Sequence, residues 1–322
     1  MGEFDLIARY FTRPVSRAAL GVGDDCALLR VSPGMQLAVS SDMLVAGRHF
    51  FDDVNPVHLG HKSLAVNLSD LAACGAAPLA FTLALSLPQV EESWLKGFAE
   101  GMFALADEHG IELVGGDTTQ GPLNICITVF GEVPAGQALL RSGARAGDDV
   151  WVSGSLGDAR LALDAMQGKV QLPPEVFRAA RQRLECPTPR VTLGQALRGI
   201  ASSALDVSDG LLGDLTHILE QSQVGAVIDA DAALSTMAAQ QRTAPDLDIR
   251  QRYQCALAGG DDYELAFTAP VAQRDAVQAA ARAAHTPVTR IGTITAEQGL
   301  RLVDAAGQPL AQQHWASFDH FA

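Results

Sequence analysis

The sequence predicts an α/β (α+β) fold with two domains, and three observations lead to this prediction. The 322 residues exceed what one hydrophobic core usually organises. Segments with the two-residue period of strands alternate with segments of helical period in both halves of the chain. Between residues 131 and 149 the alternation gives way to Gly, Pro, Arg and Ala. We therefore expect domains at residues 1–138 and 139–322.

Two helices are predicted in the first half from their end signals. Residues 56–73 form a helix, because Pro56 suits a first turn and Gly75 stands just past the end. A second, amphipathic helix is predicted from the spacing of its apolar residues and ends at Gly110; these residues are Trp94, Leu95, Phe98, Met102 and Leu105.

Strands are predicted where apolar residues alternate or run together between turn residues. A Gly/Thr-rich loop separates the third strand from the fourth, and the fifth opens the second half of the chain. The predicted strands are residues 36–41, 81–87, 111–114, 123–130 and 150–152.

Composition excludes several classes of function. The net charge is −14, and the few lysines (Lys62, Lys96 and Lys169) form no basic stripe, so neither nucleic acid nor an anionic membrane is an expected partner. No apolar run approaches the roughly 20 residues of a membrane span, and the acidic N-terminus does not resemble a secretion signal. Five scattered cysteines indicate reduced thiols, and so a cytoplasmic protein.

Aspartates recur where apolar segments give way to glycine or serine/threonine turns, the edge at which α/β folds bind ligands. These residues are Asp24, Asp25, Asp42, Asp117, Asp206, Asp209, Asp261 and Asp262. Asp70 joins them because it shares a helix face with Asn67 among apolar and small neighbours. Mg²⁺ prefers carboxylate, carbonyl and water oxygens, together with substrate phosphates. The pattern predicts a site for several divalent cations with a polyphosphate.

Other kinds of active site find little support in the sequence. None of the lysines lies in a P-loop, and no G-x-S-x-G elbow occurs. His58 and His61 lack the further ligands of a zinc site. Backbone amides of two Gly-Gly pairs, at residues 115–116 and 259–260, are candidates to hold phosphate, and Arg141 could add a charge-assisted contact.

Long motifs throughout the chain resemble the thiamine-monophosphate kinase family in order and spacing. In the first half they are Gly2-Glu-Phe4, Gly21-Val-Gly-Asp-Asp-Cys-Ala-Leu28, Ser40-Ser-Asp-Met-Leu-Val-Ala-Gly-Arg-His-Phe50, Lys62-Ser-Leu-Ala-Val-Asn-Leu-Ser-Asp-Leu-Ala-Ala73 and Gly115-Gly-Asp-Thr-Thr119. In the second half they are Arg141-Ser-Gly-Ala144, Asp206-Val-Ser-Asp-Gly-Leu211, Gly259-Gly-Asp-Asp-Tyr-Glu-Leu265 and Phe318-Asp-His-Phe321.

The resemblance implies a fold and a reaction. The fold is the aminoimidazole-ribonucleotide-synthetase-like one, in which an N-terminal metal- and ATP-binding domain pairs its sheet into a barrel across a homodimer. The C-terminal domain completes the active site. The implied reaction is transfer of the γ-phosphoryl group of ATP to thiamine monophosphate, giving thiamine diphosphate. No catalytic base is implied, because the acceptor is itself an ionised phosphate near neutral pH.

The resemblance also implies roles for individual residues. Implied metal ligands for Mg²⁺ are Asp25, Ser40, Ser41, Asp42, Asp70, Asp117, Asp206 and Asp209. Gly116, Asp117, Arg141 and Ser208 would contact ATP, and His49, Asp261, Trp315 and Phe318 would contact thiamine monophosphate. The chain departs from the family at Asp261, where Glu is common, and at Ser41, where Thr is common; both changes keep an oxygen ligand.

Two alternatives stay open at this point. The first is another ATP-using enzyme of the superfamily, such as a ligase-like synthetase or selenophosphate synthetase; the latter would carry a reactive Cys or selenocysteine and a Lys near its N-terminus, whereas the first of each here is Cys26 and Lys62. The second is a non-catalytic metal- or nucleotide-binding protein that uses the same carboxylates. Turnover of ATP with thiamine monophosphate separates all three.

Overall fold

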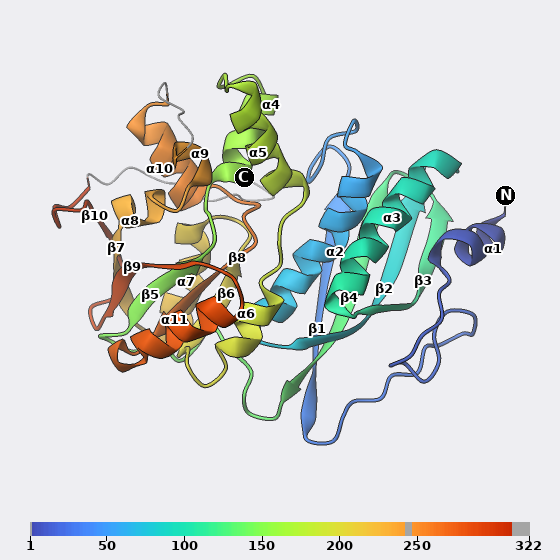
Figure 1. Ribbon diagram of the computed structural model, residues 1–322, viewed down its shortest axis with the longest axis horizontal. Helices are drawn as coiled ribbons and strands as arrows, with labels where there is room; N and C mark the ends of the chain where they lie inside the picture. The colour runs from blue at the N-terminus through green and yellow to red at the C-terminus, as the bar shows by residue number, and fades with distance from the viewer. Residues whose placement is uncertain (1, 242–246, 311–322) are drawn as a thin grey trace. The chain divides into compact units, whose positions relative to one another are not determined.

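The computed structural model describes residues 2–241 and 247–310 (Figure 1). It divides into two compact units. Unit 1 comprises Met1–Leu71 with Ala76–Gly136, and unit 2 comprises Ala72–Gly75 with Gln137–Ala322. Within the described part of the chain, none of the helices combines the length and apolarity that a membrane crossing requires.

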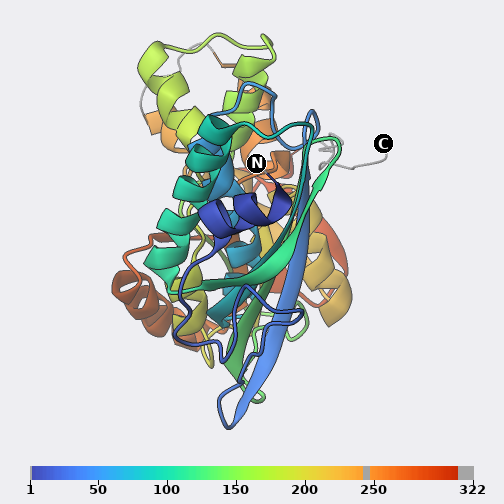
Figure 2. The same cartoon turned by 90° about the vertical axis from the view of Figure 1, so that its right-hand side faces the viewer.

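Unit 1 is built on a four-stranded mixed sheet in the order β1-β4-β2-β3. Its strands are β1 (Met35–Val45), β2 (Ala77–Leu87), β3 (Glu112–Gln120) and β4 (Asn124–Pro134). β4 is antiparallel to both β1 and β2, whereas β3 runs parallel to β2. The helices α2 (Pro56–Ala73) and α3 (Glu92–His109) lie together on one face of this sheet (Figure 2).

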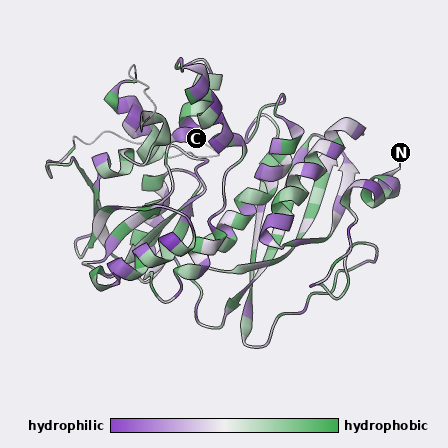
Figure 3. Cartoon of the chain, in the orientation of Figure 1, coloured by the Kyte–Doolittle hydropathy of each residue, from purple (hydrophilic) through white to green (hydrophobic). Residues whose placement is uncertain are grey.

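Both helices begin and end as their sequence signals predict. α2 starts at Pro56 and Gly75 follows it with a φ of 69°, while α3 is closed by Gly110 in the left-handed conformation. Glycines also let the two helices touch, because a Cβ at Gly60 or Gly101 would overlap the backbone of the other helix. α2 and α3 carry both hydrophobic and hydrophilic residues (Figure 3), as expected of helices that cover a sheet.

The strands are longer than predicted, and this corrects the placement of two aspartates. Asp42 and Asp117 were expected at turns but lie inside β1 and β3. The Gly/Thr-rich segment expected as a loop is part of β3, since its residues pair with β2 from Thr82 to Leu87. Gly116 permits this pairing: its φ is 144°, and a Cβ there would collide with the Leu83 backbone.

The N-terminal segment of unit 1 packs on α3 and on the sheet at two places. α1 (Glu3–Leu6) and the π-helical turn η1 (Ile7–Phe11) bury Leu6 and Phe11, and the Phe11 ring meets Phe98 of α3 edge to face with centroids 6.5 Å apart. Farther along, Val15 and Ala27 join a small apolar cluster with residues of β2, β3 and β4. This cluster anchors the segment that carries Asp24 and Asp25.

Unit 2 contains a six-stranded mixed sheet in the order β10-β7-β9-β5-β8-β6. Only the β10–β7 pair is parallel. The strands are β5 (Asp149–Ser153), β6 (Ser203–Val207), β7 (Gly225–Asp229), β8 (Glu264–Ala269), β9 (Val288–Thr295) and β10 (Gly299–Val303). The helical elements are α4 (Asp158–Met166), α5 (Pro174–Glu185), α6 (Val191–Ala196), α7 (Leu211–Ser222), α8 (Ala230–Leu234), α9 (Ala238–Gln241), α10 (Ile249–Ala258), η2 (Val271–Gln273) and α11 (Arg274–Ala283).

The core of unit 2 joins the sheet to α7. Val152 of β5, Val207 of β6 and Leu215 of α7 belong to one buried cluster. This packing fixes the end of β6 and the start of α7, between which Ser208 and Asp209 lie.

Candidate active site

Three predicted metal ligands, Ser40, Asp42 and Asp70, lie on the helix-covered face of the unit 1 sheet. Ser40 of β1 donates its hydroxyl hydrogen to Asp70 Oδ2 on α2 at 2.5 Å. Two residues along β1, the Asp42 amide donates to Asn67 Oδ1, also on α2, at 3.1 Å. Because side chains alternate along a strand, Ser40 and Asp42 share this face.

Ser41 and Asp117 lie on the opposite face. The Ser41 and Thr128 hydroxyls are 2.9 Å apart, and the register pairs Thr128 with Thr82 on the next strand. The register also carries Asp117 to this face, since it pairs with Ala84 two residues beyond Thr82. The predicted ligands of unit 1 are therefore divided between the two faces of one sheet.

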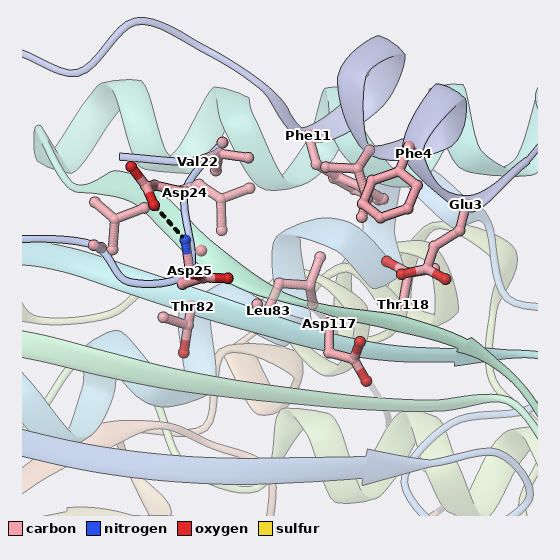
Figure 4. A pocket seen from close by; sticks show the side chains of 17 residues that line it. Glu3, Phe4, Phe11, Val22, Asp24, Asp25, Thr82, Leu83, Asp117 and Thr118 are labelled. Carbon is pink, nitrogen blue, oxygen red and sulfur yellow. Dashed lines mark hydrogen bonds between the residues drawn. The ribbon is translucent and has the colours of Figure 1, made fainter. Parts of the chain in front are cut away.

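A pocket of about 590 Å³ runs along β3 in unit 1 (Figure 4). Its volume lies in the range of small-molecule sites. Asp24 and Asp25 lie toward one end, the Phe4 ring of α1 lies toward the other, and Asp117 comes from the strand between them (Figure 4). Apolar walls come from Ile7, Phe11, Val22, Leu83, Leu113 and Val114. The pocket thus combines carboxylates with an apolar, aromatic portion.

The Asp24–Asp25 turn owes its shape to a glycine and a local hydrogen bond. Gly23 has a φ of 126°, which L side chains rarely adopt. The Asp25 amide donates to Asp24 Oδ1 at 2.9 Å. Asp24 therefore stabilises the turn through its carboxylate. Both Asp24 and Asp25 line the pocket.

His49 is held by the backbone at the end of β1. The Val45 amide donates to His49 Nδ1 at 3.0 Å, and the His49 amide donates back to the Val45 carbonyl at 3.0 Å. Because Nδ1 accepts a hydrogen bond, the neutral ring carries its proton on Nε2. One nitrogen of the imidazole is therefore committed to the fold.

In unit 2, the end of β6 and the segment before β8 lie against each other. Asp206 was expected at the turn after a strand but lies inside β6, where it pairs with Leu265 of β8 and is 9% exposed. Past the strand, the Asp261 amide donates to the Ser208 carbonyl at 2.8 Å. Asp261 has a φ of 66°, an uncommon value for a residue other than glycine. The structure thus brings Asp206, Ser208, Asp209 and Asp261 into one neighbourhood.

Arg141 is not part of that neighbourhood. Its carbonyl accepts a hydrogen bond from Ser222 Oγ at the last residue of α7, while Ser208 and Asp209 precede the first. Twelve helical residues span roughly 18 Å. Arg141 and Ser208, both implied ATP contacts, therefore lie at opposite ends of α7 and would have to reach different parts of a ligand.

Asp214 is a residue of this region to which the sequence analysis assigned no role. It lies in the first turn of α7 and accepts hydrogen bonds from the turn that contains Asp209. Burial raises the pKa of Asp214 to about 6, and the nearby Asp209 charge adds to the rise. Its position four residues after Gly210 was the available signal, since carboxylates are favoured in the first turn of a helix.

A second buried cluster supports the segment that contains Asp261. Glu264 is fully buried, and it accepts hydrogen bonds from Arg183 at 2.7 Å and from Arg190 at 2.6 Å. Both carboxylate oxygens of Asp262 accept from the Gly157 amide, and burial raises the pKa of Asp262 well above its usual value. Asp262, which the pattern of strand-end acids had included, is therefore a structural residue.

Among residues 2–241 and 247–310, no three His, Cys, Asp or Glu side chains converge closely enough to hold a metal ion by themselves. The remaining predicted contacts, Trp315 and Phe318, lie outside the described residues.

Comparison with known proteins identifies the family. Residues 23–133 match the model of the AIR synthase related protein N-terminal domain, and residues 145–305 match that of the C-terminal domain. A thiamine-monophosphate kinase of Salmonella typhimurium is 46% identical over 100% of this chain and 98% of its own length. The chain belongs to the thiamine-monophosphate kinase family. The two-domain fold and the relationship proposed from the motifs are thereby confirmed.

Solved structures of the family have the same fold. The crystal structure of the thiamine-monophosphate kinase from Stenotrophomonas maltophilia K279a is 46% identical, with a TM-score of 0.83, covering 95% of this chain and 96% of that one. AaThiL complexed with AMPPCP and TMP is 27% identical, with a TM-score of 0.73, covering 86% and 87%. That family member binds a nucleotide analogue and TMP together.

Proposed function

We propose that the chain transfers the γ-phosphoryl group of ATP to thiamine monophosphate, producing thiamine diphosphate. The observation that carries this proposal is the 46% identity, over the whole chain, to a thiamine-monophosphate kinase. The pocket of unit 1 agrees with it, because its carboxylates and its aromatic portion suit the two parts of a nucleotide that arrives with metal. The complex of AaThiL with AMPPCP and TMP supports the same pair of substrates.

In this proposal the nucleotide occupies the pocket along β3. Phe4 is 82% exposed and lines the pocket, so its ring can stack on the adenine base. Gly116 and Asp117 would face the phosphates, and Arg141 and Ser208 are the further ATP contacts that the family resemblance implies.

Mg²⁺ is the proposed cofactor, and the donor chemistry fits it. Ser40 and Asp70 already bring hydroxyl and carboxylate oxygens together on one face of the sheet, and both are hard ligands. The proposed ligands are those that the resemblance implies: Asp25, Ser40, Ser41, Asp42, Asp70, Asp117, Asp206 and Asp209. When bound, Mg²⁺ neutralises the charge of the polyphosphate and of the transferring group. A chain of net charge −14 offers few cations of its own to a polyphosphate, so we assign this neutralisation to the metal.

The acceptor phosphate needs orientation but no proton removal, since its second pKa is about 6. We assign its orientation to His49 and Asp261, and contact with the thiamine rings to Trp315 and Phe318. The backbone contact of His49 Nδ1 would direct the protonated Nε2 to the acceptor.

A homodimer is the proposed assembly, with unit 1 sheets pairing into a barrel. β1 is an edge strand of eleven residues, and Met35, Leu37, Val39 and Met43 along it are exposed. A long apolar edge strand without a cover favours aggregation. Pairing with the same strand of a second copy would remove that liability.

We also retain the cytoplasm as the proposed compartment. All five cysteines belong to the described part of the chain and are free thiols. Free cysteines are typical of a reducing compartment.

The decisive test is turnover. Purified protein is incubated with ATP, MgCl₂ and thiamine monophosphate, and thiamine diphosphate is quantified by chromatography after oxidation to fluorescent thiochrome derivatives. The proposal is supported if thiamine diphosphate forms together with one ADP per product. No thiamine diphosphate should form when thiamine replaces thiamine monophosphate or when Mg²⁺ is left out. Nucleotide binding without product would favour a non-catalytic protein, and ADP formation without thiamine diphosphate would favour another enzyme of the superfamily.

A further inference from the structure

Three consecutive backbone amides converge on one carboxylate at the end of β6. Asp214 Oδ2 accepts hydrogen bonds from the amides of Ser208 at 3.0 Å, Asp209 at 3.1 Å and Gly210 at 3.1 Å. Consecutive amides that point to one spot form an anion-binding nest. In this chain the anion is supplied from within, because Asp214 belongs to the first turn of α7.

The turn needs this support because the sheet does not extend over it. β6 is an edge strand whose pairing with β8 stops at Val207, so the next amides have no strand partner. Gly210 has a φ of 123°, and a Cβ there would press on the backbone of Ala258. On the other side, the Ser208 carbonyl accepts the Asp261 amide at 2.8 Å. The turn therefore contacts Asp214, the Ala258 backbone and the Asp261 amide. Of these, Asp214 accepts the hydrogen bonds of all three turn amides.

This arrangement separates the backbone of the turn from its side chains. The amides of Ser208 and Asp209 point to Asp214, which is 5% exposed, and both residues are themselves half-buried. Asp209, whose carboxylate is a proposed metal ligand, is therefore presented by a backbone that Asp214 holds in place.

We propose that Asp214 is the positioning residue of the metal site in unit 2: its carboxylate orders the Ser208–Gly210 turn and so sets the direction of the Asp209 carboxylate toward a divalent cation. The inference rests on the proposed function, because it takes Asp209 as a metal ligand. Asp214 contacts no substrate and acts through the turn. Residues that orient metal ligands typically change metal affinity by 10- to 100-fold when they are substituted.

The competing explanation is that Asp214 only stabilises the fold, and Asp148 is the matched control. Asp148 is in the same unit, is also 5% exposed, and accepts hydrogen bonds from the Arg145 amide at 3.0 Å and the Ser202 hydroxyl at 2.6 Å. Ser202 stands just before the first residue of β6, at the opposite end of the strand from the turn. Asp148→Asn therefore disturbs a comparable buried carboxylate away from Asp209.

The experiment measures binding of Mn²⁺ alone to the full chain by electron paramagnetic resonance, together with melting temperature, kcat and the KM for thiamine monophosphate. Asn in place of Asp214 keeps the volume but removes the negative charge, so the three amides that meet at Oδ2 are left with a neutral carbonyl oxygen, a weaker acceptor than a carboxylate. We expect Asp214→Asn to weaken one class of Mn²⁺ site at least tenfold and to lower kcat, with the KM for thiamine monophosphate changed less than twofold. Asp148→Asn is expected to lower the melting temperature without weakening Mn²⁺ binding.

Equal Mn²⁺ binding by Asp214→Asn and wild type, or an equal loss in Asp148→Asn, would overturn the proposal. If Asp214→Asn does not fold, Asp214→Glu takes its place; a displaced carboxylate should still weaken Mn²⁺ binding, and unchanged binding would refute the role. Asp209→Asn separates this inference from the function on which it rests. If that variant binds Mn²⁺ normally while wild type makes thiamine diphosphate, the positioning role is wrong and the proposed function stands.

Discussion

Replacing Phe4 with Ala tests where the nucleotide binds. Because Phe4 is 82% exposed, removing its ring takes little packing from the folded chain, and the melting temperature should stay within about 2 °C of wild type. A base that stacks on an aromatic ring gains about 1–3 kcal/mol. We take the lower part of that range because Phe4 is largely exposed, and roughly 1.4 kcal/mol corresponds to a tenfold rise in the dissociation constant for ATP.

The assay determines the dissociation constant for a non-hydrolysable ATP analogue by calorimetry and both KM values by steady-state kinetics. Phe4→Tyr keeps the ring and should bind as wild type does. Val271→Ala, which removes a half-exposed apolar side chain from unit 2, should change nothing. Phe11 is unsuitable for this purpose, because it is buried against Phe98 and its truncation would cost about 3–5 kcal/mol of stability. A Phe4→Ala constant for the analogue within twofold of wild type, or equal rises of both KM values, would refute stacking.

Three further predictions follow from other parts of the chain. Asp117→Asn should lower kcat by about 100-fold or more at saturating Mg²⁺ with an unchanged melting temperature, since Asp117 is exposed. As a control, Asp107→Asn changes another exposed aspartate of unit 1 and should keep full activity. A near-normal kcat of Asp117→Asn would show that Asp117 is not a metal ligand. The hydrogen bonds and charges of two arginines hold the pKa of Asp149 below its usual value, so this carboxylate adds stability above pH ~4 that is lost as pH falls through its lower folded pKa. Asp149→Asn should therefore melt roughly 2–4 °C lower at pH 7, with a difference that shrinks as the pH falls below the usual aspartate pKa of about 4; a difference independent of pH would contradict this. Val39→Glu, at a position 56% exposed on β1, should yield a folded monomer by light scattering, whereas Val271→Glu should not change the assembly; a dimeric Val39→Glu would argue against pairing through β1.

Local signals in the sequence predicted where the helices begin and end. The extent of the strands was not predicted, because it depends on pairing between segments that are distant in the sequence. Pro56 and Gly110 mark ends of α2 and α3 because capping depends on the few residues around it. The segment after residue 114 was predicted as a loop from its glycines and threonines. It is strand because β2 offers it a hydrogen-bonding partner, and that preference is visible only in the folded chain.

The site was predicted by residue type better than by position. Strand-end reasoning placed Asp206, Asp209 and Asp261 near one another, and the structure agrees. The same reasoning misplaced Asp42, Asp117 and Asp206 relative to the strand ends, since they lie within β1, β3 and β6. The role of Asp214 was not predicted, because its carboxylate can accept hydrogen bonds from three amides only after the turn has formed. No spacing in the sequence expresses that geometry.

The alternation of Ser40 and Ser41 has a consequence for how β1 can change during evolution. These neighbours face opposite sides of one sheet, Ser40 toward Asp70 on α2 and Ser41 toward Thr128 on β4. Inserting or deleting a single residue upstream within β1 would exchange the two sides for every later residue of the strand. Substitutions can therefore accumulate along β1 one at a time, but its length cannot drift by one residue. In the connection after β4, from residue 135 to residue 148, side chains do not alternate between the two faces of a sheet, so a length change there would not exchange the sides of a strand.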